Sequence, residues 1–201
     1  MKNKDKKPKS SIDNFESPDF YNLDDLLTQE HIMIRNSIRD FVKKEISPFI
    51  EDWSEKNYFP SEIVRKMGEI GIFGPTTSEK YGGGGLDYIS YGIIMQEIER
   101  GDSGMRSTAS VQSSLVMFPI EEYGSEEQKN KFLPKLASGK ILGCFGLTEP
   151  DHGSNPSGMK TKCEDKGDHY LLNGSKMWIS NSPEADIAIV WAKDENGRIK
   201  G

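Results

Sequence analysis

Residues 143–162, GCFGLTEPDHGSNPSGMKTK, contain the point at which the character of the chain changes. The run from Ile141 to Leu147 is short and apolar, which is typical of a buried strand. Acidic residues, hydroxyls, two prolines and spaced glycines follow at once and indicate a loop. Such a loop can hold phosphate oxygens, because glycine lets the backbone approach and amide groups point at the anion. Two interpretations stay open: a plain surface loop, or the floor of a site for a phosphate-bearing cofactor.

The chain before this stretch predicts helices, because apolar residues recur there at helical spacing. Thr28 is the predicted N-cap of the first helix, and Pro48 predicts a kink or an end. Ser125 and Gln128 form a predicted capping box. In the second helix the residues expected to face inward are Ile63, Val64, Met67 and Ile70, and Gly71 is the expected stop. The helices are predicted at 28–46, 61–71, 88–104, 105–124 and 125–139.

The chain after residue 140 predicts short strands at 141–147, 169–181 and 185–193, which are β-branched or aromatic. The pair Asn173-Gly174 predicts a hairpin turn between Tyr170–Leu172 and Lys176–Ile179. The last residues, ENGRIKG, resemble another hairpin turn whose return strand is missing. Helices followed by strands, without βαβ alternation, indicate an α+β fold.

Composition excludes several classes of protein. The chain has 201 residues, of which 34% are hydrophobic and 29% charged, as expected for a globular protein with a real core. A net charge of -6 argues against a nucleic-acid role, and no segment approaches a membrane span. The Lys-rich head is expected to be a solvated tail. Cys144 is expected in the core, and neither it nor Cys163 has metal-ligand spacing to a histidine, so we expect no metal and a reducing compartment.

Two further stretches carry candidate binding residues. In EIERGDSGMRS, Glu99 and Arg106 lie about two helical turns apart, and an arginine there could clamp a carboxylate. The alternative is a solvated cluster of salt bridges. In KMWISNSP, Trp178 could cover a flat heterocycle and Ser180 could bond to its edge; the alternative is a core tryptophan. The stretch YGGGGLD is expected to be an inter-helix turn, since no strand precedes it.

Taken together, these stretches resemble one family. The motifs LGCFGLTEP at 142–150, LNGSKMWISNSP at 172–183, EIERGDSGMRS at 97–107 and MGEIG at 67–71 occur in one order. In this respect residues 21–201 are similar to the amino-terminal half of the acyl-CoA dehydrogenases, and within them to the glutaryl-CoA dehydrogenase group. The resemblance implies a head at 1–20, a helical domain at 21–139 and the beginning of a middle, antiparallel β-domain at 140–201.

The resemblance also implies a site for FAD. Thr148 would bond the isoalloxazine edge, and Ser154 would lie near the pyrophosphate and the CoA arm of the substrate. Arg106 and Ser107 would bind the distal carboxylate of glutaryl-CoA, with Glu99 nearby. Ser180 stands where the family usually has threonine, which keeps the hydroxyl. The implied flavin-contacting residues are Phe145, Gly146, Leu147, Thr148, Glu149, Gly153, Ser154, Trp178, Ile179 and Ser180.

The implied reaction is α,β-dehydrogenation of an acyl-CoA thioester, with decarboxylation to crotonyl-CoA if the substrate is glutaryl-CoA. The base is a glutamate expected beyond residue 201, so neither Glu99 nor Glu149 takes that role. Electron-transferring flavoprotein is the implied acceptor, a homotetramer the implied assembly, and lysine and tryptophan degradation the implied pathway. We expect the protein to lie in the cytoplasm of a bacterium, or in the mitochondrial matrix if the source is eukaryotic.

Two alternatives remain open on the sequence. One is a short- or branched-chain acyl-CoA dehydrogenase. The other is a non-catalytic fragment that binds flavin or acyl-CoA, or a helical interaction module.

Overall fold

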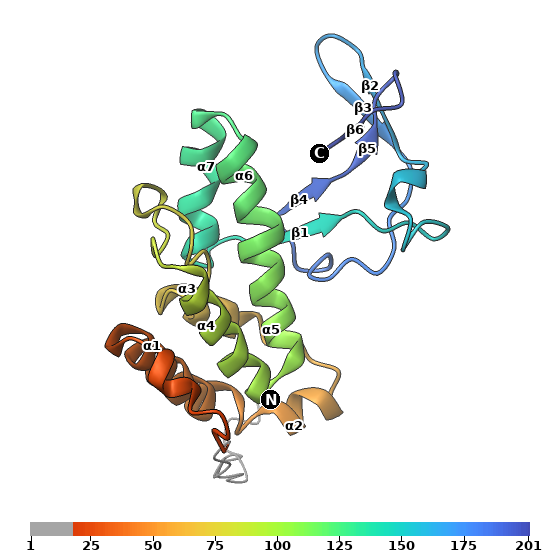
Figure 1. Ribbon diagram of the computed structural model, residues 1–201. Helices are drawn as coiled ribbons and strands as arrows, with labels where there is room; N and C mark the ends of the chain where they lie inside the picture. The colour runs from red at the N-terminus through yellow and green to blue at the C-terminus, as the bar shows by residue number, and fades with distance from the viewer. Residues whose placement is uncertain (1–17) are drawn as a thin grey trace.

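The chain folds into a helical half and a strand half that meet along one long helical rod (Figure 1). The computed structural model describes residues 18–201, so the predicted Lys-rich head lies almost entirely outside the described residues. The described chain is helical up to Ala137, and the first strand begins at Gly143. This order confirms the predicted α+β class.

The helical half contains α-helices joined by short 3-10 and π-helical segments. Its α-helices are α1 (Gln29–Phe41), α2 (Ile50–Glu55), α3 (Ser61–Glu69), α4 (Tyr88–Gly101), α5 (Ser103–Ser110), α6 (Phe118–Tyr123) and α7 (Glu126–Ala137). The 3-10 segments are η1 (Leu23–Leu26) and η3 (Glu79–Tyr81), and the π-helical segments are η2 (Val42–Ile46) and η4 (Val111–Met117). The segments α5, η4 and α6 follow one another without a break and form the rod.

Local signals fix the ends of these helices. Thr28 accepts a hydrogen bond from the backbone of His31, whose side chain bonds back to Thr28. Ser125 and Gln128 form the predicted capping box of α7. Gly139 ends α7 with a φ of 65°, a left-handed conformation that glycine adopts without strain. These predictions are confirmed.

The core of the helical half is built from the inward faces of the helices. Ile38, Met67, Ile94 and Leu133 come from four different helices and are almost fully buried. The prediction that Ile70 faces inward is wrong, because its side chain is 44% exposed. Helix α3 ends at Glu69, so the chain has already left the helical path there, and Ile72 takes the buried position instead. Among residues 18–201 we find no helix with the length and apolarity needed to cross a membrane.

The strand half contains two small sheets, one parallel and one of mixed direction. Strand β1 (Gly143–Gly146) pairs in parallel with β4 (Ile187–Val190). The other sheet has the order β3-β2-β5-β6. Its strands are β2 (Lys162–Asp165), β3 (Tyr170–Asn173), β5 (Ala192–Lys193) and β6 (Ile199–Lys200). Within it β2–β3 and β5–β6 are antiparallel and β2–β5 is parallel, so the expected antiparallel pairing describes only part of the strand half.

The predicted hairpin at Asn173-Gly174 is wrong. Strand β3 pairs with the preceding β2, and no strand forms at Lys176–Ile179. Tertiary contacts decide this outcome, because Met177 donates its backbone N–H to Thr148 O at 2.9 Å. The turn predicted in ENGRIKG does form, but the prediction that its return strand is missing is wrong, because β6 at Ile199–Lys200 pairs with β5.

One buried side chain joins the two halves. Gln112 lies in η4 and is fully buried. Its Nε2 donates to Leu136 O and Ile141 O, each at 2.9 Å, and its Oε1 accepts from Gly143 N at 2.8 Å. Gly143 is required at this contact, since a Cβ there would lie 2.5 Å from Val116 Cγ1. The first strand is therefore packed directly on the rod.

We predict that Gln112→Leu lowers the free energy of unfolding by about 2–4 kcal/mol, because buried backbone groups lose their partners. Urea denaturation of the variant measures the change. The matched control is Gln96→Leu, at an exposed position of α4, where we expect a change within about 0.5 kcal/mol. Equal effects at the two positions would contradict the role of Gln112 as the junction.

Candidate functional site

The loop after β1 places the predicted flavin-contacting residues at the edge of the strand half. Leu147 and Thr148 are half-buried, whereas Gly153 and Ser154 are exposed. The loop folds back on itself at Glu149 and His152, whose backbone groups exchange two hydrogen bonds of 3.2 Å. It ends in a short 3-10 turn, η5 (Pro156–Gly158), before β2 begins. The hydroxyl of Ser154 is thereby presented to solvent on an ordered loop.

Glu149 points into this loop rather than out of it. Its side chain is 4% exposed and accepts hydrogen bonds from Lys160 N, Thr161 N and Thr161 Oγ1 at 2.6, 3.0 and 2.5 Å. The ammonium of Lys176 lies 2.9 Å from the carboxylate. Burial by itself raises the pKa of Glu149, but these hydrogen bonds outweigh burial and hold the pKa at about 2. The carboxylate of Glu149 therefore organises the loop. That Glu149 contacts the flavin stays a prediction, and the buried side chain leaves only its backbone for that contact.

The segment around Trp178 lies beside this loop. Met177 N donates to Thr148 O at 2.9 Å, and Asn181 Nδ2 donates to Gly143 O at 3.1 Å. Trp178 has a left-handed backbone with a φ of 59°, and its side chain is 84% exposed. The alternative that Trp178 is a core tryptophan is therefore wrong. Ile179 is half-buried and Ser180 is exposed.

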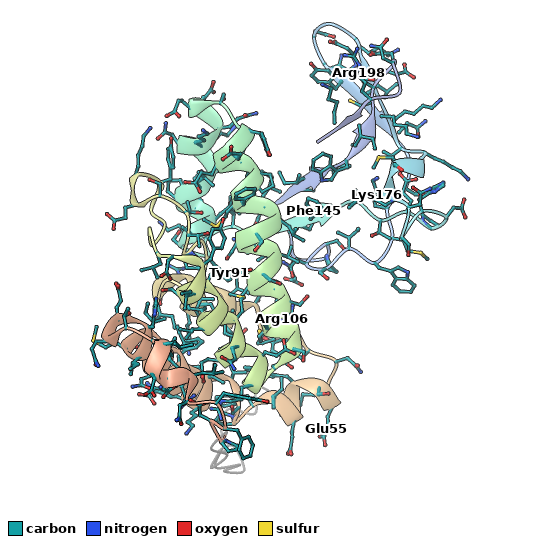
Figure 2. The ribbon with its side chains drawn as sticks, in the orientation of Figure 1. Glu55, Tyr91, Arg106, Phe145, Lys176 and Arg198 are labelled. Atoms are coloured by element: carbon teal, nitrogen blue, oxygen red, sulfur yellow. The ribbon has the colours of Figure 1, made fainter. Side chains whose placement is uncertain are left out.

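Phe145 and Lys176 lie on the strand side and Arg106 lies on the helical rod (Figure 2). Phe145 packs edge-on against Trp191, with ring centroids 6.0 Å apart. Lys176 lies close to Gly146, since a Cβ there would be in ordinary contact with Lys176 Cγ at 3.4 Å. The aromatic ring of Phe145 thus supports β1, and Lys176 passes over the end of the strand.

The residues of the predicted carboxylate clamp lie where α4 meets α5, and there they form an ion pair with each other. The helix breaks at Asp102, which caps α5 by accepting from Met105 N at 2.7 Å. Arg106 nevertheless reaches Glu99, with Nε 2.5 Å from Oε2. The hydrogen bonds from Arg106 and then Ser103 lower the pKa of Glu99. The break therefore brings the two charges together although the helix does not continue between them.

The sequence interpretation missed Ser110, which lies one turn beyond Arg106. Its hydroxyl is 3.4 Å from Arg106 Nη1 and donates to Ser107 O at 3.0 Å. An i, i+4 spacing from Arg106 on a predicted helix was the available signal. Arg106 thus has a carboxylate on one side and a hydroxyl on the other.

One cleft is lined both by α5, which carries Arg106, and by the irregular segment that follows Trp178. Its volume is about 660 Å³, and Trp53 and Phe59 form part of its apolar wall. Ser107 of α5 and Ser180 of the irregular segment both line it. Residues that are 73 positions apart in sequence (107 and 180) therefore face one cavity. Trp53 and Phe59 were not predicted as site residues, because an apolar residue in a helical stretch indicates a core position.

No metal centre was predicted from the sequence, so there is no predicted metal ligand to locate in the structure. Among the described residues no group of three or more histidines, cysteines or acids is arranged to hold a metal ion. Cys144 is buried in β1, as predicted, and burial raises the pKa of its thiol.

Comparison with known proteins shows the family of this chain. Residues 28–140 match the family model of the acyl-CoA dehydrogenase N-terminal domain, and residues 144–201 match that of the acyl-CoA dehydrogenase middle domain. The chain belongs to the acyl-CoA dehydrogenase family. The sequence resemblance is thus confirmed at the level of the family.

Individual acyl-CoA dehydrogenases show how far the similarity extends. Glutaryl-CoA dehydrogenase of Desulfococcus multivorans is 46% identical over 83% of this chain and 43% of its own length. The mitochondrial short-chain specific acyl-CoA dehydrogenase of Rattus norvegicus is 38% identical over 86% and 42%. A crystal structure of glutaryl-CoA dehydrogenase from Mycobacterium smegmatis with FADH2 matches with a TM-score of 0.87 and 48% identity, over 90% of this chain and 46% of that chain. The chain spans less than half the length of these relatives.

We predict that Glu149 makes stability depend on pH below about 5. Its pKa is about 2 in the folded chain, against about 4.3 when unfolded. The stabilisation is therefore complete above the unfolded value and is lost as pH falls toward 2. Thermal melts of Glu149→Gln from pH 6 to pH 2 should show a shallower fall in Tm than the parent chain. Glu164→Gln, at an exposed ion pair, is the control and should keep the parent slope.

Proposed function

We propose that this chain forms the flavin- and acyl-binding part of an FAD-dependent acyl-CoA dehydrogenase that acts on glutaryl-CoA. The observation that carries the proposal is the cluster of Glu99 on α4 with Arg106 and Ser110 on α5. Ser107, the residue after Arg106, lines the same cleft as Ser180. A dicarboxylic acyl group needs a cation at the far end of its pocket, and a monocarboxylic one does not. Glutaryl-CoA dehydrogenases among the similar proteins agree with this choice of substrate.

The donor chemistry of the strand half fits FAD. A flavin needs an apolar face for its ring and hydrogen-bonding groups for its edge and its phosphates. Trp178 offers a large exposed indole, and Thr148 and Ser180 offer hydroxyls on two adjacent segments. In this proposal Thr148 and Ser180 bond the ring edge, Trp178 and Ile179 cover the ring, and Ser154 with Gly153 faces the pyrophosphate.

The clamp would recognise the distal carboxylate through Arg106. A guanidinium has five N–H donors, and Glu99 occupies the Nε side. The Nη side faces Ser110, at 3.4 Å, and can turn to a second carboxylate. Glu99 keeps the arginine oriented and repels the substrate carboxylate from other positions. The pair would therefore select the position of the distal carboxylate as well as its charge.

FAD, when bound, supplies the two-electron acceptor for α,β-dehydrogenation. The residues of this chain would hold the acyl group and exclude water, and the glutamate base is assigned to a portion that follows residue 201. Electron-transferring flavoprotein as acceptor, a homotetramer, and a bacterial cytoplasmic or mitochondrial matrix location belong to the same proposal. Decarboxylation to crotonyl-CoA would follow from a substrate with a distal carboxylate.

A short-chain acyl-CoA dehydrogenase is the second candidate. Glu99 already neutralises Arg106, so a monocarboxylic acyl chain would meet a pocket without net charge. The similarity to a short-chain specific enzyme is consistent with this alternative. The two candidates differ only in what Arg106 does when substrate binds.

We predict that Arg106→Ala in the full-length enzyme lowers kcat/KM for glutaryl-CoA by roughly 30- to 150-fold, which corresponds to about 2–3 kcal/mol for a charge-assisted hydrogen bond. Activity on butyryl-CoA should change less than about threefold, because that acyl group has no distal charge. Steady-state kinetics with both substrates, together with release of CO2, measure the difference.

The control is Arg65→Ala, which removes an exposed arginine of α3 and should leave both substrates unaffected. Equal losses on glutaryl-CoA and butyryl-CoA in Arg106→Ala would favour the short-chain alternative.

We also predict that the 201-residue chain alone retains little or no FAD, since the family resemblance implies that FAD also contacts a further domain. The absorbance near 450 nm of the purified chain, compared with that of the full-length enzyme, measures retention. Stoichiometric, tightly held FAD in the short chain would show that the site is complete within these residues.

A further inference from the structure

The two proposed flavin-contacting segments are held together by one buried ion pair. Lys176 Nζ donates to Glu149 Oε1 at 2.9 Å and to Leu147 O at 3.0 Å. The two side chains are 12% and 4% exposed, so the pair is almost removed from water. Lys176 precedes Trp178 by two residues, and Glu149 follows Thr148 directly. The pair therefore lies between the residues that would touch the flavin.

Glu149 is also the centre of its own loop. Its carboxylate gathers the backbone N–H groups of Lys160 and Thr161 and the hydroxyl of Thr161. These bonds join the start of the loop after β1 to its end, eleven and twelve residues later. Lys176 adds a third part of the chain to the same carboxylate. A single group thus fixes three segments.

The segment that carries Trp178 has few other restraints. No strand forms at 176–179 in the described chain, and Trp178 is exposed with a left-handed backbone. Its attachments to the β1 side are Met177 N to Thr148 O, Asn181 Nδ2 to Gly143 O, and the Lys176 ammonium. Little packing surrounds the exposed indole, so the position of the segment that carries it depends on these polar attachments.

We propose that Glu149 and Lys176 are positioning residues that set the placement of Thr148 relative to the Trp178–Ser180 segment, and thereby tune flavin binding. The inference rests on the proposed function, because it concerns the same site. Neither side chain needs to touch the flavin. Their effect is transmitted through the backbone at 147–149 and at 176–178.

Other ion pairs in the strand half do not have this geometry. Lys160 and Asp151 pair within one loop, and Lys166 and Glu164 pair within the β2–β3 hairpin, all with exposed side chains. Exposed pairs contribute little, whereas removing one partner of a buried pair leaves an uncompensated charge. The Lys166–Glu164 pair is therefore a matched control, because a substitution there removes a charge without acting on the two flavin-contacting segments.

The test uses the full-length protein with Glu149→Gln, Lys176→Met, the double variant, and the control Lys166→Met. The dissociation constant of FAD, the visible flavin spectrum and the flavin reduction potential are measured at a temperature at which circular dichroism shows every variant folded. We expect each single variant to weaken FAD binding by roughly ten- to a hundredfold, as for residues that orient a ligand-binding group, and to shift the spectrum. Lys166→Met should match the parent protein.

The double variant distinguishes positioning from general damage. If the two residues act as a unit, the double variant loses no more affinity than the worse single variant, because neither charge is left buried alone. Additive losses, or folded single variants with the parent affinity and spectrum, would overturn the inference. Should the unmodified protein bind no FAD, the proposed function itself fails, which is a different result from normal FAD binding in all variants.

Discussion

The hydrogen bonds of the buried Gln112 side chain are the constraint on which the rest of the structure depends. They join η4 to the end of α7 and to the first residue of β1, where Gly143 packs against Val116 without room for a side chain. Gln112 lies in a π-helical segment, and such segments are frequent at functional sites. Because α5 continues directly into η4, the same junction sets how far the Arg106 clamp lies from the strand that precedes Thr148.

The site on the strand side is organised by side chains rather than by a sheet. Strands β1 and β4 are short, and the segments that follow β1 and precede β4 are irregular. Buried polar groups must be paired, and an irregular backbone leaves many groups to be paired by side chains. Glu149, Lys176 and Asn181 do so here, and they leave Trp178 and Ser180 facing outward.

Helices and their ends could be predicted because their signals are local. Thr28, Ser125 and Gly139 act on backbone groups within a few residues, so their roles hold wherever the helix packs. Strand pairing could not be predicted in the same way. Asn173-Gly174 has the local signature of a hairpin turn, but Lys176 and Met177 bond to the loop after β1, and β3 pairs with β2 instead. The prediction that Ile70 is buried was also wrong, because α3 ends at Glu69, before that position.

The sequence by itself determined the α+β order, the helix ends marked by Thr28, Ser125 and Gly139, the burial of Cys144 and the identity of the residues that carry charge and hydroxyls near the site. Those properties follow from periodicity and from contacts a few residues long. Only the tertiary structure decided that Glu149 turns inward, that Arg106 meets Glu99 across a broken helix, and that Ser107 and Ser180 share one cleft. Each of these depends on which distant segment supplies the partner, and the free energy of a buried charge or hydrogen bond depends on that partner.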